Sequence, residues 1–129
     1  VVFALNTHFD HMGEEARLQS ARLLADTIGS MAHDGELVVL TGDFNAGPGS
    51  KPIGLLAARL TDTRGAASVD GVMPQPATFN GWDAARYTDC IDFIFCNKNG
   101  KPLSWRVFTR PGVYLSDHYM VMATLGWSR

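Results

Sequence analysis

Leu37-Val-Val-Leu-Thr-Gly-Asp-Phe-Asn45 is an apolar run that ends abruptly in a glycine, a carboxylate and an amide. Residues 37–40 show no polar alternation, which predicts a strand buried on both faces. Gly42 lets the backbone turn, so Asp43 and Asn45 leave the carboxyl end of this strand on one side. Open α/β sheets place their chemistry at such strand ends, although the same residues also suit an ordinary exit from strand to loop.

The segments before this run predict a strand followed by a helix. Val1–Thr7 is an apolar strand, and Gly13-Glu-Glu15 opens a helix because acidic residues in a first turn complement the helix dipole. Apolar residues then recur at spacings of three and four up to Met31, which gives one stripe for packing on a sheet. A crossover of this length predicts that the two strands run parallel.

The second half of the chain predicts one more helix and three more strands. They cover Ile53–Leu60, Tyr87–Cys96, Leu103–Thr109 and Tyr119–Leu125. Asn97-Lys-Asn-Gly100 is a hairpin signal, so Leu103–Thr109 is predicted to be the return strand. Thr61–Gln75 is polar and long, and we expect it to be a mobile connection.

Composition indicates a globular chain of single-domain size, with 129 residues, 46% of them hydrophobic and 19% charged. No apolar run is long enough to cross a bilayer. A formal charge of −2 argues against a strongly basic face for nucleic acid, although a local basic patch is still open. Cys90 and Cys96 flank one predicted strand and would lie about 20 Å apart at roughly 3.3 Å per residue, too far for a disulfide. The compartment stays undecided.

Four short motifs follow one another along the chain: Asn6-Thr-His8, Gly42-Asp-Phe-Asn45, Ile91-Asp-Phe-Ile-Phe95 and Ser116-Asp-His118. In this order the set resembles the endonuclease/exonuclease/phosphatase family of metal-dependent phosphoesterases, which includes pancreatic-type DNases and inositol polyphosphate phosphatases. The resemblance runs from Val1 to nearly the last residue. It implies an α/β fold that is half of the four-layer α/β/β/α sandwich (DNase I-like), with a mixed sheet and helices on one face.

The resemblance implies a site for phosphoester hydrolysis. In it Asp43 orients or activates water, Asn45 and His8 hold phosphate oxygens, Asp92 fixes His118, and Asp117 helps to bind Mg²⁺ or Mn²⁺. The residues themselves support one pair, because an acid in an otherwise apolar strand needs a partner and His118 is the obvious one for Asp92. Oxygen ligands suit a hard cation, and the chain has no Cys/His spacing for zinc. Whether His118 acts as a base or as an electrostatic clamp is left open.

Four further residues are candidates for substrate binding, namely Asn6, His11, Arg17 and Trp82. His11 and Arg17 resemble a histidine and an arginine of bacterial-type family members, but they suit a solvated loop and a helix-face charge equally well. Trp82 can stack on a base or sugar, or pack in the core. His8 also has a plainer interpretation, as a loop histidine bound to backbone.

The resemblance indicates that Val1–Arg129 is a single carboxyl-terminal portion of the family's domain. In the family an earlier part of the chain supplies a second sheet and a metal-binding glutamate, and no segment here matches them. We therefore expect the amino-terminal sheet to be lacking, a missing lobe or partner chain to cover the sheet, and the isolated chain to be inactive. The substrate is a nucleic acid or a phosphorylated small molecule, and the alternatives are a binding module that has lost the chemistry or a structural fragment.

Overall fold

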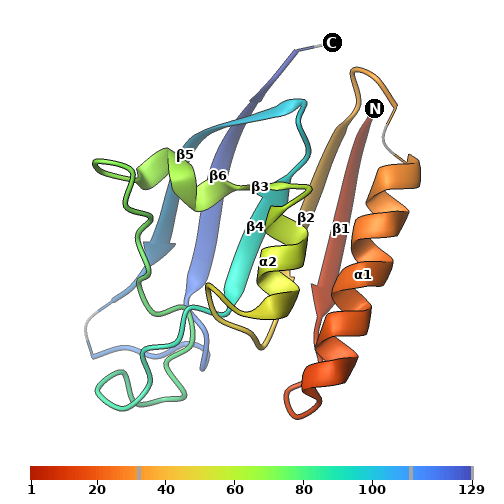
Figure 1. Cartoon of the computed structure of the whole chain (residues 1–129). Coiled ribbons are helices and arrows are strands. Elements are labelled where there is room, and N and C mark those ends of the chain that lie inside the picture. Colours follow the sequence, from red (N-terminus) through yellow and green to blue (C-terminus); the bar gives the residue numbers. More distant parts are fainter. Residues whose placement is uncertain (32, 111, 129) are drawn as a thin grey trace.

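The computed structural model describes residues 1–31, 33–110 and 112–128, and it places the strands in two sheets (Figure 1). The larger sheet has the order β1-β2-β4-β3, formed by β1 (Val2–His8), β2 (Leu37–Asp43), β4 (Asp92–Cys96) and the short β3 (Thr61–Asp62). The smaller sheet pairs β5 (Gly100–Phe108) with β6 (Met120–Trp127). The helices are α1 (Glu14–Met31), α2 (Lys51–Ala57) and the 3₁₀ helix η1 (Thr63–Ala67).

The larger sheet is mixed, as the resemblance implied. β1 and β2 are parallel, which confirms the prediction from the crossover length, and His8 lies opposite Asp43. β4 runs antiparallel to β2 and puts Asp92 on the other side of Asp43. The carboxyl ends of β1 and β2 and the amino end of β4 therefore meet at one edge of the sheet.

The hairpin predicted after β4 does not form. The turn itself is present, since the Gly100 amide donates to the Asn97 carbonyl at 3.0 Å, but β5 pairs with β6 and not with β4. Both edges of β4 are already taken, because Cys96 faces β2 on one side and β3 on the other. The turn is instead tied to the start of β2, where the Asn97 and Asn99 side chains both donate to the Glu36 carbonyl.

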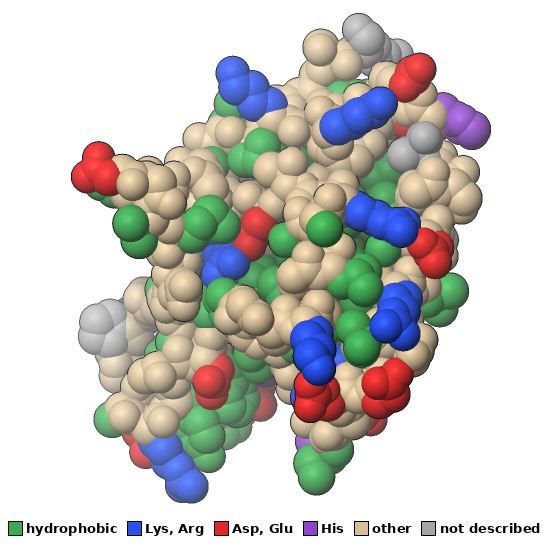
Figure 2. All heavy atoms as spheres, in the orientation of Figure 1, with side chains coloured by type: hydrophobic (Ala, Val, Ile, Leu, Met, Phe, Trp, Pro, Cys, Tyr) green, Lys and Arg blue, Asp and Glu red, His purple; other side chains and the backbone are tan. Residues whose placement is uncertain are grey.

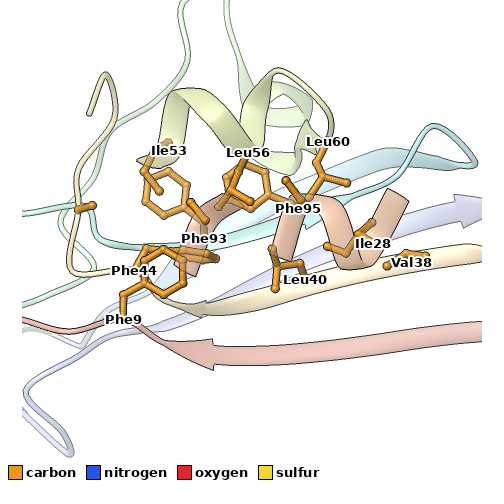
Figure 3. Close-up of a cluster of buried hydrophobic side chains, with 13 residues drawn as sticks. Phe9, Ile28, Val38, Leu40, Phe44, Ile53, Leu56, Leu60, Phe93 and Phe95 are labelled. Carbon is orange, nitrogen blue, oxygen red and sulfur yellow. The ribbon is translucent and has the colours of Figure 1, made fainter. Parts of the chain in front are cut away.

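Helices α1 and α2 cover one face of the larger sheet, which we call the outer face (Figures 1 and 3). The core between them is centred on Phe44, whose side chain is fully buried. Its ring meets those of Phe9, Phe93 and Phe95 edge to face, with centroids 4.9, 5.7 and 5.7 Å away. Ala21, Ala25 and Ile28 of α1 are buried in the same core, which confirms the apolar stripe predicted for this helix.

The opposite, inner face of the larger sheet is covered in part by β5 and β6. β6 starts beside Asp92, to which His118 is bound, and it ends where Trp127 Nε1 donates to the Gly35 carbonyl just before β2. The chain thus supplies a two-stranded sheet of its own on this side, and the expectation that the amino-terminal sheet is lacking stays a prediction. Along β1 that face stays open, and Val2 is 50% exposed.

The connection expected to be mobile is built into the fold at its start. Thr63 and Arg64 are buried, and Thr63 Oγ1 donates to the Ile94 carbonyl at 2.8 Å. Arg64 forms an ion pair with Asp62 at 2.5 Å and lies over the Phe93 ring. The prediction is therefore wrong for residues 61–67, because a local polar pattern does not reveal an ion pair that Phe93 of a distant strand covers. For residues 68–75 it stays a prediction.

Both cysteines are free, and both are buried. Burial raises the pKa of the Cys90 and Cys96 thiols, so both stay protonated at neutral pH. Within the described residues, no helix combines the length and the apolar character needed to span a membrane.

Candidate active site

The candidate site lies at the sheet edge where β1, β2 and β4 meet. Asp43, the last residue of β2, stands between His8 of β1 and Asp92 of β4 in the strand register. His8 Nε2 lies 3.3 Å from Asp43 Oδ2, although the His8 side chain is largely exposed. Alternation along each strand directs all three side chains to the inner face, away from the helices.

Asp92 and His118 form the closest pair in the site. His118 Nδ1 lies 2.9 Å from Asp92 Oδ2, and its other ring nitrogen, Nε2, lies 3.6 Å from Asp43 Oδ2. The imidazole thus stands between two partly buried carboxylates that belong to neighbouring strands. A carboxylate on Nδ1 fixes the rotation and tautomer of the ring, which leaves Nε2 directed at the position where a reacting group would bind.

Two buried residues that the sequence did not single out hold this pair in place. Thr78 Oγ1 accepts the backbone N–H groups of Ile91 and Asp92 at 2.9 and 3.0 Å, while the Thr78 carbonyl accepts the Tyr119 N–H at 2.7 Å. Asn80 Nδ2 donates to the Ser116 carbonyl at 3.1 Å. One short segment therefore ties the start of β4 to the segment that carries His118.

The sequence gives one signal for the supporting role of Thr78 and Asn80. Both are short polar residues in the segment 76–82, before the strand that carries Asp92. Residues of this type are common in turns, where they bond to nearby backbone. Their long-range partners are visible only once the segments are folded together.

Asn45 and Asn6 are both bound within the protein. Asn45 adopts a left-handed backbone with φ of 46°, its N–H donates to Asp43 Oδ1 at 2.8 Å, and its side-chain amide donates to the Phe9 carbonyl at 2.8 Å. Asn6 Oδ1 accepts the Thr41 hydroxyl at 2.9 Å. Asn45 therefore links the loop after β1 to the loop after β2, right beside Asp43.

Gly42 allows β1 and β2 to come together at this edge. A Cβ atom at Gly42 would lie 2.1 Å from the Thr7 carbonyl oxygen, closer than any side chain can approach. A larger residue here would push apart the strand ends that carry His8 and Asp43.

His11 and Arg17 lie around the start of α1, and the structure gives them local roles. Arg17 Nη1 donates to the Asp10 carbonyl at 2.9 Å, and the His11 side chain is exposed. The backbone N–H groups of Gly13 and Met12 donate to the Asp10 carboxylate and hold the pKa of that group below its usual range. Asp10, which the sequence analysis passed over, thus organises the entry into α1, and a substrate role for His11 and Arg17 stays a prediction.

Trp82 is 59% exposed and has a left-handed backbone with φ of 66°. Its N–H donates to Asn80 Oδ1 at 2.9 Å, which places it on the turn that follows the buried Thr78–Asn80 segment. The Trp82 side chain is therefore not packed in the core, which was one of the two interpretations of the sequence. Stacking on a substrate stays a prediction.

Among the described residues, Asp43, Asp92 and His118 form a group that could hold a cation together. Each offers one ligand atom, and these atoms all lie within 4.8 Å of one another. Two carboxylates suit a hard cation, because Mg²⁺ is often bound through one or two carboxylates and completes its shell with water and phosphate oxygens. Asp117, the ligand implied by the resemblance, is outside this group; it accepts from Ser116 Oγ at 3.3 Å.

A pocket of about 350 Å³ adjoins these carboxylates on the inner face. Asp43 and Asp92 line it from the larger sheet, and Tyr119 and Val121 line it from β6 and the residue before it. The acidic cluster is therefore open to a ligand.

Comparison with known proteins identifies the family. The family model of the endonuclease/exonuclease/phosphatase family matches residues 2–118, which include all four motifs around the site. The chain belongs to this family. No curated protein sequence matches it.

Solved structures of the family share the fold. An endonuclease/exonuclease/phosphatase from Bacteroides vulgatus is 31% identical with a TM-score of 0.76, and the match covers 94% of this chain and 48% of that one. A family protein from Bacteroides thetaiotaomicron is 27% identical with a TM-score of 0.74, covering 95% and 47%. A mannosyl-6-phosphatase of the same organism is 25% identical with a TM-score of 0.73, covering 96% and 51%. The chain thus has the DNase I-like fold and spans about half the length of these structures.

Charged side chains on the helix-covered side of the molecule are mixed in sign. Figure 2 shows Lys and Arg side chains among Asp and Glu and apolar groups over α1 and α2, with no single basic field. This distribution agrees with the formal charge of −2.

Proposed function

We propose that the protein carrying this chain is a Mg²⁺- or Mn²⁺-dependent phosphoester hydrolase, acting on a phosphodiester in nucleic acid or on a small phosphorylated molecule. The observation that carries the proposal is the placement of His118 between two carboxylates, 2.9 Å from Asp92 and 3.6 Å from Asp43. Family membership supports the reaction class, and the mannosyl-6-phosphatase among the similar structures is named for the hydrolysis of a phosphate ester.

The proposed roles follow from the contacts of each side chain. Asp92 holds the His118 ring through Nδ1, so that Nε2 can bind a phosphate oxygen or exchange a proton with water. Asp43 lies within reach of both His8 and His118, which is the position expected for the group that orients the attacking water. Asn45 fixes Asp43 through its N–H and would bind a phosphate oxygen with its amide only by exchanging the present bond to Phe9.

A divalent cation would supply charge neutralisation for the phosphate and polarise the bond that breaks. Asp43 and Asp92 fit its chemistry as oxygen donors, and we assign Asp117 as a further ligand by resemblance. Asp92 is less suited as a metal ligand, because its Oδ2 atom already binds His118 Nδ1. Following the resemblance, we place the metal principally on Asp117 and on ligands from outside this chain, and we assign Asp43 to the attacking water.

We propose that further residues complete the inner face. Since the chain spans about half of the similar structures, a missing amino-terminal lobe or a partner chain has room to supply the remaining sheet and a metal-binding glutamate. The open inner side of β1, with Val2 half exposed, is where such a lobe would pack. On this proposal the isolated chain, whether as a fragment or as a binding module, does not hydrolyse phosphoesters.

The test is hydrolysis of bis(4-nitrophenyl) phosphate by the natural full-length protein with Mg²⁺ or Mn²⁺, before and after chelation. Asp43→Ala should abolish hydrolysis and retain Mn²⁺ affinity, whereas Asp117→Ala should weaken Mn²⁺ binding at least tenfold. Metal affinity is measured by titration calorimetry. If Asp43→Ala alone loses affinity, the roles of the two carboxylates are reversed, and hydrolysis that survives complete chelation would rule out the metal-dependent reaction.

A further inference from the structure

A second and larger pocket lies next to His118, at the end of the β5–β6 hairpin. Its volume is about 600 Å³, within the range of pockets that bind small molecules. Phe108, the last residue of β5, and Met120, the first of β6, are paired in the strand register and both line the pocket. Exposed Val113 and Tyr114 line it from the loop between the two strands. Apolar side chains gathered in this way at a surface usually mark a binding site.

The pocket is joined to the candidate active site through two adjacent residues. His118 lines the larger pocket, and its ring binds Asp92 through Nδ1. Tyr119 lines both this pocket and the smaller one that contains Asp43 and Asp92. A phosphoester whose phosphate lies at His118 would therefore direct one of its organic substituents into the larger pocket.

The lining residues favour an aromatic group over a sugar. Phe108, Tyr114 and Tyr119 supply rings, and Arg110 supplies a positive charge. Among the described residues that line the pocket there is no acidic side chain, so the pocket offers no ion pair to a cationic ligand, whereas Arg110 can pair with an anionic one. Thr109 and Ser116 also line the pocket, but its surface is mainly apolar. A sugar needs hydrogen-bonding partners for most of its hydroxyl groups, whereas a planar ring can stack on aromatic walls and lie under a guanidinium.

Two contacts fix the walls of the pocket. The Tyr114 hydroxyl accepts the Ala84 N–H at 3.2 Å, which ties the loop after β5 to the turn near Trp82. The Arg106 guanidinium lies 4.5 Å from the centre of the Phe108 ring. Walls held in this way lose little conformational freedom when a ligand binds.

We propose that this pocket holds an aromatic group attached to the scissile phosphoester, so that the protein selects phosphoesters with an aromatic ring close to the phosphate. The inference rests on the proposed hydrolase function and adds the class of substrate. It assigns substrate recognition to Phe108, Tyr114 and Arg110, none of which belongs to the four motifs.

The test compares benzyl phosphate with mannose 6-phosphate in the natural full-length protein, each as the monoester and as the methyl diester. Both are esters of primary alcohols, so their intrinsic reactivities are similar and differences in kcat/KM report recognition. We expect the benzyl compounds to be favoured at least tenfold. Phe108→Ala should raise KM for the benzyl compounds about tenfold, in line with the worth of an aromatic contact.

Leu103→Ala is the matched control, because Leu103 lies on the same strand, is 55% exposed and is not among the residues that line the pocket. It should leave the preference unchanged. Equal turnover of both series, or an equal loss with both in Phe108→Ala, overturns the pocket inference while the hydrolase function stands. Absence of hydrolysis of every ester overturns the function, and the substrate class with it.

Discussion

The two faces of the larger sheet are built in opposite ways. On the outer face, Phe44 and its neighbouring rings are sealed under α1 and α2 (Figure 3). On the inner face, Asp43, Asp92 and His118 lie beside a pocket, under a hairpin that covers β4 and leaves β1 open. The outer face therefore contributes most of the stability, and the inner face, where polar groups are held by a few long-range hydrogen bonds, contributes the chemistry.

Phe44→Ala tests the outer face and should have the largest effect on stability. The side chain is fully buried and meets three other rings, so its removal leaves a cavity and should lower the free energy of unfolding by about 3–5 kcal/mol. Urea unfolding measures the change. Val72→Ala, at a position that is 72% exposed, should change stability by less than about 0.5 kcal/mol. Similar losses in the two variants would contradict the division between the faces.

Asp92→Asn tests the inner face and should affect turnover more than stability. The amide can present its NH₂ to the ring and cannot hold His118 in the required tautomer, so turnover by the full-length protein should fall about 10²-fold or more. Asp89→Asn, three residues earlier with an exposed side chain, is the control and should keep normal turnover. Near-normal turnover of Asp92→Asn would show that the proposed pair is not used.

Thr78→Val tests whether the residues of the inner face depend on the hydrogen bonds that the buried Thr78 hydroxyl accepts. The valine cannot accept the N–H groups of Ile91 and Asp92, which should lower the free energy of unfolding by about 2 kcal/mol. Turnover should fall as well, because the same segment positions Tyr119 and hence His118. Thr88→Val, at an exposed position, should change neither quantity. A loss of stability with turnover intact would separate Thr78 from the site.

Val2→Asp examines the open part of the inner face in the full-length protein. If another lobe packs on β1, the new charge is buried there, and stability should fall by about 1.5 kcal/mol or more. Leu23→Asp on α1 is the control at another exposed apolar position, 69% exposed against 50% for Val2, and should be tolerated. Thermal unfolding of both variants gives the comparison, and equal tolerance would mean that β1 faces solvent in the whole protein.

The elements that the sequence predicts well are those with local signals. The apolar stripe of α1 and the unbroken run of β2 have periodicities that few other structures satisfy, and the length between β1 and β2 indicates parallel pairing. The pairing of β5 with β6 was not predicted, because it depends on both edges of β4 being occupied by β2 and β3. The buried Arg64 was missed for a similar reason, since its shelter comes from Phe93, far along the chain.

In the candidate site, too, the residues with local sequence signals were predicted and those with only long-range contacts were missed. Asp43, Asp92 and His118 were found because each lies in a short motif next to an apolar strand, and the structure brings them together. Thr78 and Asn80 escaped notice because the polar groups they bind are distant in sequence. The pocket at Phe108 and Met120 arises from strand pairing, and no local pattern predicts it.

The path of β6 has a consequence for the order in which the protein is made. β1, α1 and β2 precede β4 and β6 in the chain, so they leave the ribosome before those strands do. His118 and β6, whose Trp127 Nε1 donates to the Gly35 carbonyl, are made after β1, β2 and β4. Until then Asp43 and Asp92 lie opposite each other with no imidazole between them. We therefore expect chains truncated before His118 to lack hydrolytic activity even when the proposed lobe or partner chain is supplied.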